Sequence, residues 1–388
     1  MNNFIFENFT KIYFGKGCVK EYLASLIREY QTVMLAYGGG SIKRNGIYDE
    51  ILLILKREGK TIIEFQNILP NPTYQKVLEG AELARTFHVE IILAVGGGSV
   101  IDCCKAVSMA SVYKGDLWAD YWERKGIIDF EPIPLGAVVT AAGAGSESNG
   151  TAIITNEECK IQTGRDYVKC SPRFALMDPS YTCSVPQKQA VSEGFDILSR
   201  IMETYFSYPD EDNVSDNISE ALMGSVIRNL EALIEDPGDY TARSNLFWDS
   251  SMADNRIIQL GKQCDFQCHQ MAHQLSAYRD CNHGEVLAVL HPVYYRHIYR
   301  AGLGKFVRFA EQIWNVPREG KSDDEMALAG IRALEHFIKG LGLPGRLRDL
   351  GFSDRSQLDA IADSCRIPGS SYKPITHREI RMIFQECF

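Results

Sequence analysis

One short stretch limits what this chain can fold into more than any other: an apolar run followed at once by three glycines. Ile91 to Val95 are suited to a strand buried on both faces, and the glycines at 96–98 then allow a tight turn. Ser99 can cap a helix beyond the turn, with Asp102 three residues on at capping-box spacing. The amide groups of such a helix start favour an anionic phosphate. A turn without a ligand is the alternative, because GGGS is not the GxGxxG fingerprint of dinucleotide sites.

A second copy of the strand-GGGS arrangement lies earlier in the chain, where Val33 to Ala36 precede a GGGS at 38–41. Lys43 and Arg44 follow it, and cations in a first helical turn oppose the helix dipole unless an anion offsets them. An NAD site places a carboxylate at the end of this strand for the ribose 2′-hydroxyl, whereas a 2′-phosphate favours glycine, serine and a base. The sequence therefore predicts NADP rather than NAD. Two solvated surface cations are the alternative interpretation.

The amino-terminal half alternates between strand and helix patterns, which indicates a parallel sheet. Strands are expected over residues 4–14 (a strand pair), 33–36, 61–65, 91–95, 132–140, 151–155 and 174–177, with helices over 19–30 and through Val77, Ala81, Ala84 and Phe87. Right-handed crossovers would bring both glycine turns to the carboxyl edge of this sheet, where doubly wound folds bind ligands. The small residues at 141–150 would let backbone approach a flat ring or a phosphate, or would form only a flexible turn.

The carboxy-terminal half reads as helices. Apolar residues recur with helical spacing from Ala327 to Leu341, and Gly342 and Pro344 then end the pattern. Because 388 residues exceed what one core usually organises, we expect two domains, at 1–184 and 185–388. The active site is expected in the cleft between them.

Composition narrows the classes of function. A net charge of −9 argues against nucleic acid as a partner and leaves small molecules. The chain has no apolar run long enough for a membrane span and no signal-peptide pattern at its start, so we expect a cytoplasmic protein without a membrane partner. The 11 cysteines lack zinc-finger spacing and are expected to be reduced, without a catalytic role.

Three of the eight histidines fall within fifteen residues of the helical half, in CHQMAHQLSAYRDCNHG. His269 and His273 at i, i+4 share one helix face, and His283 precedes a glycine in a turn. This geometry suits two metal ligands, or one ligand and a proton relay. Hydrogen-bonded core histidines are the alternative.

Several motifs in order give the chain a resemblance to a known family. They are YGGGSIKRNGIYDE, GGGSVIDCCK, GSESNGTAIITNEE, FALMDPSYT, GFDILSRIMETYF and HQMAH…HG. The chain resembles the iron-containing (group III) alcohol dehydrogenases over nearly its whole length, most closely the butanol dehydrogenase-like branch. The resemblance implies a doubly wound, mainly parallel α/β dinucleotide domain joined to an all-α domain, an architecture shared with dehydroquinate synthase. A sugar-phosphate lyase of that kind is a further alternative.

The resemblance also implies an activity, cofactors and site residues. The implied reaction is reversible hydride transfer between NAD(P)H and an aldehyde or alcohol. The implied cofactors are NADP, with NAD as the alternative, and Fe2+ or Zn2+, and the implied assembly is a homodimer. The implied metal ligands are Asp196, His269 and His283, and His273 would lie beside the nicotinamide and relay a proton. The cofactor is expected to contact Gly38, Gly39, Gly40, Ser41, Asn71, Gly96, Gly97, Gly98, Ser99, Asp102, Thr140, Ala141 and Asn149.

The chain departs from this pattern at the fourth ligand, where the family has histidine and this sequence has Arg200. A guanidinium stays protonated and has no lone pair to offer. At about 4 Å and an effective dielectric constant of about 20, a divalent ion would lose roughly 8 kcal/mol to it. Structural zinc sites are worth about 10 to 16 kcal/mol. We therefore expect no tightly bound metal, unless Arg200 turns towards Glu203 or three ligands plus water suffice; an ordinary Asp196–Arg200 ion pair would need no metal.

A second departure is Gln162, where the family usually has lysine; Lys160 on the same strand face could compensate and contact the cofactor. Two alternatives to a metal-dependent butanol dehydrogenase-like enzyme follow from the departures. In one, Arg200 is catalytic and stabilises the oxyanion, or binds the carboxylate of an acidic carbonyl substrate, as in the related metal-free maleylacetate reductases. In the other, the protein is a nucleotide-binding pseudoenzyme.

Overall fold

The structure is a computed structural model that describes residues 1–264, 266–367 and 372–388. It contains two compact units, which we describe separately. The sheet unit comprises residues 7–186 and 238–255, and the helical unit comprises residues 1–6, 187–237 and 256–388. The predicted domain boundary at 184/185 stays a prediction, and no sequence pattern indicated that residues 238–255 pack with the sheet unit.

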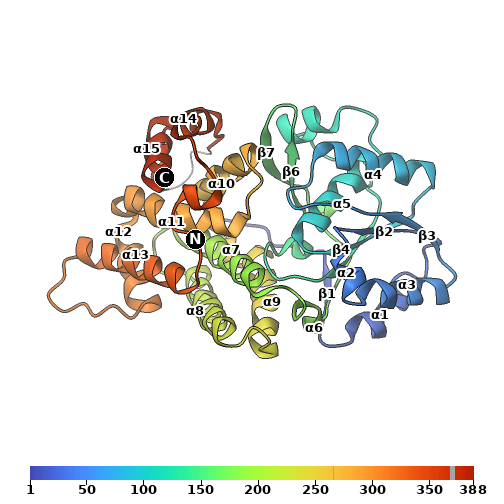
Figure 1. The fold of residues 1–388 in the computed structure, drawn as a ribbon, viewed down its shortest axis with the longest axis horizontal. Helices are drawn as coiled ribbons and strands as arrows, with labels where there is room; N and C mark the ends of the chain where they lie inside the picture. Colours follow the sequence, from blue (N-terminus) through green and yellow to red (C-terminus); the bar gives the residue numbers. More distant parts are fainter. Residues whose placement is uncertain (265, 368–371) are drawn as a thin grey trace. The chain divides into compact units, whose positions relative to one another are not determined.

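The sheet unit is built on six parallel strands in the order β1-β8-β5-β4-β2-β3. Their bounds are β1 Lys11–Phe14, β2 Thr32–Tyr37, β3 Thr61–Phe65, β4 Ile91–Gly96, β5 Leu135–Val139 and β8 Phe174–Met177 (Figure 1). Every residue of β4 is buried, as its apolar run predicted. The expectation of a strand pair over 4–14 was wrong, because only residues 11–14 find a neighbouring strand, β8, to accept their hydrogen bonds.

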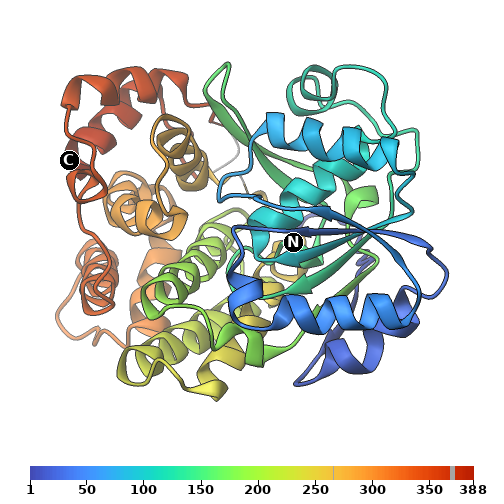
Figure 2. The ribbon, with the colours of Figure 1, turned by 45° about the vertical axis from the view of Figure 1, so that its right-hand side comes forward.

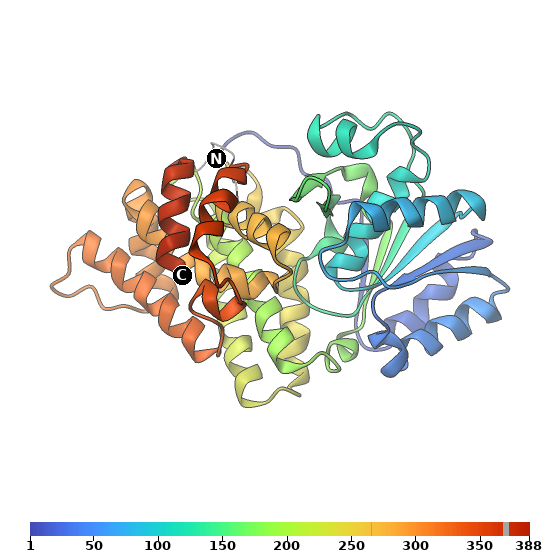
Figure 3. The same ribbon diagram turned by 45° about the horizontal axis from the view of Figure 1, so that its top comes forward.

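Helices cover both faces of this sheet, because successive strand residues point to opposite sides. Val33, Leu35 and Leu93 pack with α1 and α3, whereas Met34 and Ile92 pack with α4 and α5. Figures 2 and 3 show α4 on one side of the strands and α3 on the other. The helices are α1 Cys18–Leu26, α2 Ser41–Arg44, α3 Ile47–Arg57, α4 Tyr74–Thr86, α5 Gly98–Ala110, α6 Pro179–Thr182 and α9 Tyr240–Asp254. This is the predicted doubly wound arrangement.

A two-stranded antiparallel hairpin lies apart from the main sheet. It consists of β6 Thr151–Asn156 and β7 Ile161–Asp166. The backbone amide of Thr155 donates to the carbonyl of Pro72 at 2.9 Å, which joins the hairpin to the turn before α4. The strand predicted at 151–155 therefore forms, but outside the parallel sheet.

The helical unit contains α7 Gln187–Tyr205, α8 Val214–Glu235, α10 Gln267–Tyr278, α11 His283–Ile298, α12 Leu303–Arg308, α13 Asp323–Gly340, α14 Arg355–Ser364 and α15 His377–Cys387. The helix predicted from the apolar spacing at 327–341 is α13, and a capping box of Ser322 and Glu325 starts it. Among the described residues, no helix is long and apolar enough to cross a membrane. All 11 cysteines are free, as expected.

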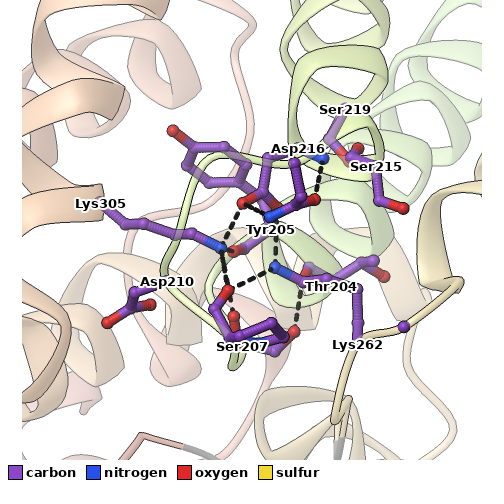
Figure 4. A network of polar contacts seen from close by, with 12 residues as sticks. Thr204, Tyr205, Ser207, Asp210, Ser215, Asp216, Ser219, Lys262 and Lys305 are labelled. Atoms are coloured by element: carbon purple, nitrogen blue, oxygen red, sulfur yellow. Dashed lines mark hydrogen bonds and ion pairs between the residues drawn. The ribbon is translucent and has the colours of Figure 1, made fainter. Parts of the chain in front are cut away.

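A buried ion network ties α7, α8 and α12 together within the helical unit (Figure 4). The Lys305 ammonium lies 2.6 Å from Asp216 and donates to the carbonyls of Tyr205 at 3.0 Å and Ser207 at 3.2 Å. Lys262 binds the other oxygen of Asp216 at 2.7 Å. Asp216 and Lys305 together therefore hold α7, α8, α12 and the segment of Lys262 in one arrangement.

Candidate functional site

The two glycine turns follow neighbouring strands, because β2 and β4 pair directly in the sheet. Both therefore lie at the carboxyl edge, as predicted. Helix α5 begins at Gly98 with Gly97 as its N-cap, and no side chain caps it. The expectation that Ser99 caps this helix was wrong, because the helix already starts one residue earlier. Its first amide groups are thus left for an anion at the start of a thirteen-residue helix.

The loop at 140–150 lies against the second glycine turn. The amide of Thr140 donates to the carbonyl of Gly96 at 3.1 Å, and a Cβ added to Gly98 would meet the Cβ of Ala144 at 2.8 Å. A Cβ on Gly97 would lie 3.5 Å from Ala141. Only glycine at 98 permits this approach, so the structure brings together Thr140, Ala141 and the glycine turn that the sequence assigned to one site.

Lys105 anchors this loop from inside the unit. Its fully buried ammonium donates to Ser146 Oγ at 2.7 Å, Asn149 Oδ1 at 3.1 Å and the Thr151 carbonyl at 2.6 Å. Asp102 lies 3.8 Å from the ammonium and accepts from the hydroxyl of Ser146. We call Asp102, Lys105, Ser146, Asn149 and Thr151 the lysine network.

Asp102 and Asn149 are thus engaged within the protein. Asp102 also accepts from the Ile153 amide at 3.0 Å, and the Asn149 side chain donates to Asp254 at 2.7 Å. Both residues are less than 10% exposed. The contacts that the structure gives them are structural, and direct contact with a cofactor stays a prediction. Sequence spacing alone could not distinguish the two roles.

Asn71 and Gln162 meet beside the hairpin. The Gln162 side-chain amide donates to Asn71 Oδ1 at 3.0 Å and to Thr155 Oγ1 at 2.9 Å. Lys160 lies in the turn before β7 with a φ of 53°, so the expectation that it shares a strand face with Gln162 was wrong. Its role as a cofactor contact stays a prediction.

Lys43, which follows the first glycine turn, contacts a charged residue that was not predicted from the sequence, Glu64 of β3. The Lys43 ammonium lies 4.9 Å from the ring centre of Tyr37, 4.6 Å from that of Tyr48 and 3.8 Å from the Glu64 carboxylate. Both tyrosine hydroxyls donate to Glu64, at 2.5 and 2.7 Å, and these bonds lower the pKa of its carboxyl group. The pairing of β2 with β3 could have pointed to Glu64, but only once strand order was known.

A histidine cluster forms in the helical unit, where α7, α10 and α11 meet. Ligand atoms of Asp196, His269 and His283 all lie within 4.8 Å of one another, so the structure brings together the three predicted metal ligands. The Arg200 Nε lies 3.4 Å from Asp196 Oδ1, and His269 Nε2 lies 3.4 Å from the same oxygen. The predicted Asp196–Arg200 ion pair is therefore present. Although burial raises the pKa of Asp196, Arg200 and His269 lower it overall.

Glu203 supports this cluster through contacts with the start of α10 and with the His269 ring. The sequence did not predict these contacts. It accepts from the backbone amides of Cys268 at 2.7 Å and His269 at 3.1 Å, and it also contacts Nδ1 of the His269 ring. Burial lowers the pKa of His269, but Glu203 and Asp196 outweigh it and raise the pKa. Glu203 thus holds the start of α10 and directs His269 Nε2 towards Asp196.

His273 differs from its neighbours, because neither of its ring nitrogens has a hydrogen-bond partner among the described residues. It stacks on His283, with ring centres 5.0 Å apart. Burial and the neighbouring histidines lower the pKa of His273 well below its usual range, and burial lowers that of His283 to about 4. A buried polar group without a partner is costly, and a ligand bonded to either nitrogen would remove that cost, so the predicted role of His273 stays a prediction.

Comparison with known proteins gives the same family along the whole chain. Residues 10–179 match the model for "Iron-containing alcohol dehydrogenase", and residues 190–388 match "Fe-containing alcohol dehydrogenase family, C-terminal". NADH-dependent butanol dehydrogenase A of Clostridium acetobutylicum is 36% identical over 98% of both chains. NADPH-dependent aldehyde reductase YqhD of Escherichia coli is 33% identical over 93% of this chain and 92% of its own. A crystal structure of NADH-dependent butanol dehydrogenase A from Thermotoga maritima superposes with a TM-score of 0.93 at 34% identity, covering 100% of this chain and 99% of that one.

Proposed function

We propose how the reaction proceeds in this chain, which belongs to the iron-containing alcohol dehydrogenase family. The resemblance inferred from its motifs is confirmed. The chain is an NAD(P)H-dependent oxidoreductase of alcohols and aldehydes, as its relatives are named. The observation that carries the proposed course is the open helix start at Gly98, next to a loop anchored by Lys105.

The pyrophosphate of the cofactor would bind the free amide groups at the start of α5, where the helix dipole favours negative charge. The turn at Gly38–Ser41 would take the adenosine end, and we keep NADP as the proposed cofactor because Lys43 stands beside that turn. Glu64 opposes this choice, since its carboxylate already pairs with Lys43 and would repel a 2′-phosphate. Binding constants for NADPH and NADH therefore decide the matter.

The family description implies iron, so the fit of a divalent ion to the histidine cluster matters. Asp196, His269 and His283 offer three suitable atoms. An ion about 2.1 Å from Asp196 Oδ1 would lie within roughly 5.5 Å of Arg200 Nε. At an effective dielectric constant of about 20 the two charges would then repel by about 6 kcal/mol. Four-ligand zinc sites are worth about 10–16 kcal/mol, and this cluster has one ligand fewer. These residues do not fit a tightly bound divalent ion.

The reduction can be written with the chain's own groups. Hydride passes from C4 of the nicotinamide to the carbonyl carbon, and the carbonyl π electrons move to its oxygen. The Arg200 guanidinium would stabilise the oxyanion that forms. His273, whose ring nitrogens lack partners among the described residues, would hydrogen-bond the alkoxide and pass it a proton drawn from solvent. The products are an alcohol and NAD(P)⁺.

The proposed substrates are small aldehydes and alcohols, as the names of the relatives indicate. Arg200 favours a second class, carbonyl compounds that carry a carboxylate, because a guanidinium binds carboxylates through two parallel hydrogen bonds. Oxidation of NADPH and NADH should be followed over a panel containing butanal, longer aldehydes and keto acids. Turnover of butanal above every keto acid would reject the second class, and no turnover of any carbonyl compound would reject the proposed reaction.

We also propose a homodimer. Phe4, Ile5 and Phe6 are exposed, Ile5 to 95%, and β1 is an edge strand of its sheet. Exposed apolar segments and open strand edges are characteristic of association surfaces, and a second copy of the chain would cover them. Light scattering coupled to size exclusion should give twice the mass of one chain. Replacing Ile5 by Lys should give the monomer mass, and a monomeric parent protein would contradict the proposal.

A further inference from the structure

A buried arginine stands where a bound ion would need a neutral ligand. Arg200 and Asp196 lie one helical turn apart on α7, and each is only 8% exposed. The oxygen of Asp196 that faces Arg200 Nε is also the oxygen that faces His269 Nε2. The negative charge of Asp196 is therefore already paired with groups of the protein itself.

We propose that Arg200 closes this site to divalent cations, so that the chain works as a metal-independent member of a family described as iron-containing. The proposal deepens the proposed function, because it concerns the same cluster. Its physical cause is a fixed charge: a guanidinium cannot be deprotonated in a protein, and it has no lone pair for a metal. An ion would have to displace Arg200 from Asp196 and also leave that cation buried beside it.

Glu203 orients the cluster through contacts within the chain. Its carboxylate accepts two backbone amides at the start of α10 and contacts the His269 ring. The ring is thereby oriented by the protein alone. A carboxylate that bonds a histidine in this way is also common in metal sites, so Glu203 does not by itself exclude an ion. Arg200 determines whether an ion binds.

The second group of potential ligands in the described chain, Glu203, Cys268 and His291, does not offer another site. Glu203 already bonds α10, and Nε2 of His291 lies 2.5 Å from Ser199 Oγ.

The first test is the metal content of the full-length protein, purified without chelator from cells supplied with iron and zinc. Mass spectrometry of the metals should find less than about a tenth of an equivalent per chain. About one equivalent of iron or zinc would overturn the proposal. NAD(P)H oxidation should be unchanged by a chelator, whereas a protein without any turnover would contradict the proposed function and leave the metal result standing.

Variants separate the charge of Arg200 from the missing ligand. Arg200→Gln removes the charge, Arg200→His removes the charge and adds a ligand, and Arg200→Lys retains the charge. Calorimetric titration with cobalt, together with its visible absorption, should show affinity rising at least a hundredfold for Arg200→Gln and further for Arg200→His. Arg200→Lys should bind as weakly as the parent.

Equal cobalt affinity for the parent and Arg200→Gln would overturn the charge argument. Unchanged circular dichroism and unchanged NADPH binding, which involves the sheet unit, would show that the variants are folded. If Arg200→Gln does not fold, Arg200→Met provides the same neutral replacement with more apolar packing, and the same hundredfold gain is expected.

Discussion

The lysine network of the sheet unit and the histidine cluster of the helical unit are both buried and rich in charge. They differ in how many of their polar atoms have hydrogen-bond partners. Lys105 has three hydrogen bonds and a nearby carboxylate, and Asn149 uses both its oxygen and its amide nitrogen. In the histidine cluster, by contrast, both ring nitrogens of His273 and one of His283 lack partners among the described residues.

This difference is the basis on which we assign the first region a structural role and propose a chemical role for the second. A satisfied buried network rigidifies its surroundings. A buried imidazole without partners costs stability, and proteins retain such strain at sites where a ligand or substrate supplies the missing bond. We therefore expect substitutions in the two regions to have opposite consequences.

The largest effect is expected for Lys105→Met. It would leave Asp102 buried without its counter-ion and would release the 140–150 loop, so the free energy of unfolding should fall by about 3–5 kcal/mol. NADPH affinity should fall with it. Urea denaturation and fluorescence titration measure both, with Lys114→Met, an exposed lysine, as the matched control. Parent-like stability would show that the network is not structural.

His273→Leu should have the opposite pattern, with stability retained and activity reduced. Removing a buried imidazole without partners should leave stability unchanged or raise it by about 1 kcal/mol. Loss of a proton donor to the alkoxide should lower kcat about a hundredfold. Steady-state kinetics beside urea denaturation would reveal the pattern. A variant that lost stability but kept kcat would place His273 with the structural residues.

One buried group in each unit, His291 and Glu147, should also respond to pH in opposite directions. Burial lowers the pKa of His291 to about 4, so the unfolded chain binds more protons between about 4 and 6.5. The contribution of His291 to stability should therefore fall by about 1 kcal/mol per pH unit as pH falls through this range. Burial raises the pKa of Glu147, so the contribution of Glu147 should instead be lost as pH rises above about 4.5.

Hydrogen exchange of peptides from α11 and from the 140–150 loop, measured at several pH values, can distinguish these trends. Protection of α11 should grow from pH 4 to 6.5, and His291→Gln should flatten that growth. The same direction of change in both peptides would argue against the contrast between the units.

The smallest effect concerns the choice of cofactor. Glu64→Gln would free Lys43 to meet a 2′-phosphate and should improve NADPH over NADH binding about fivefold. Lys43→Ala should shift the ratio the other way. Fluorescence titration with both cofactors measures these ratios. A ratio unchanged in both variants would exclude Lys43 from cofactor selection.

Local patterns predicted the parts of the fold that depend on neighbours in the chain. The apolar run before Gly96 became β4, and the helical spacing after Ala327 became α13. The errors concern partners far away in sequence. Asp102 at capping-box spacing instead bonds Ser146, forty-four residues on, because a loop outside its own helix approaches closely. Glu64 was missed for the same reason, and Glu203 was considered only as a partner for Arg200, since the contacts of both residues become visible only after strands and helices have packed.

The pairing of Arg200 with Asp196 also bears on how metal binding at this cluster evolves. The rest of the cluster is intact around that one side chain, and a single base change can turn an arginine codon into a histidine codon. The single substitution Arg200→His therefore completes the set of metal-binding side chains, and selection in the laboratory on media rich or poor in iron would show in which direction this position changes.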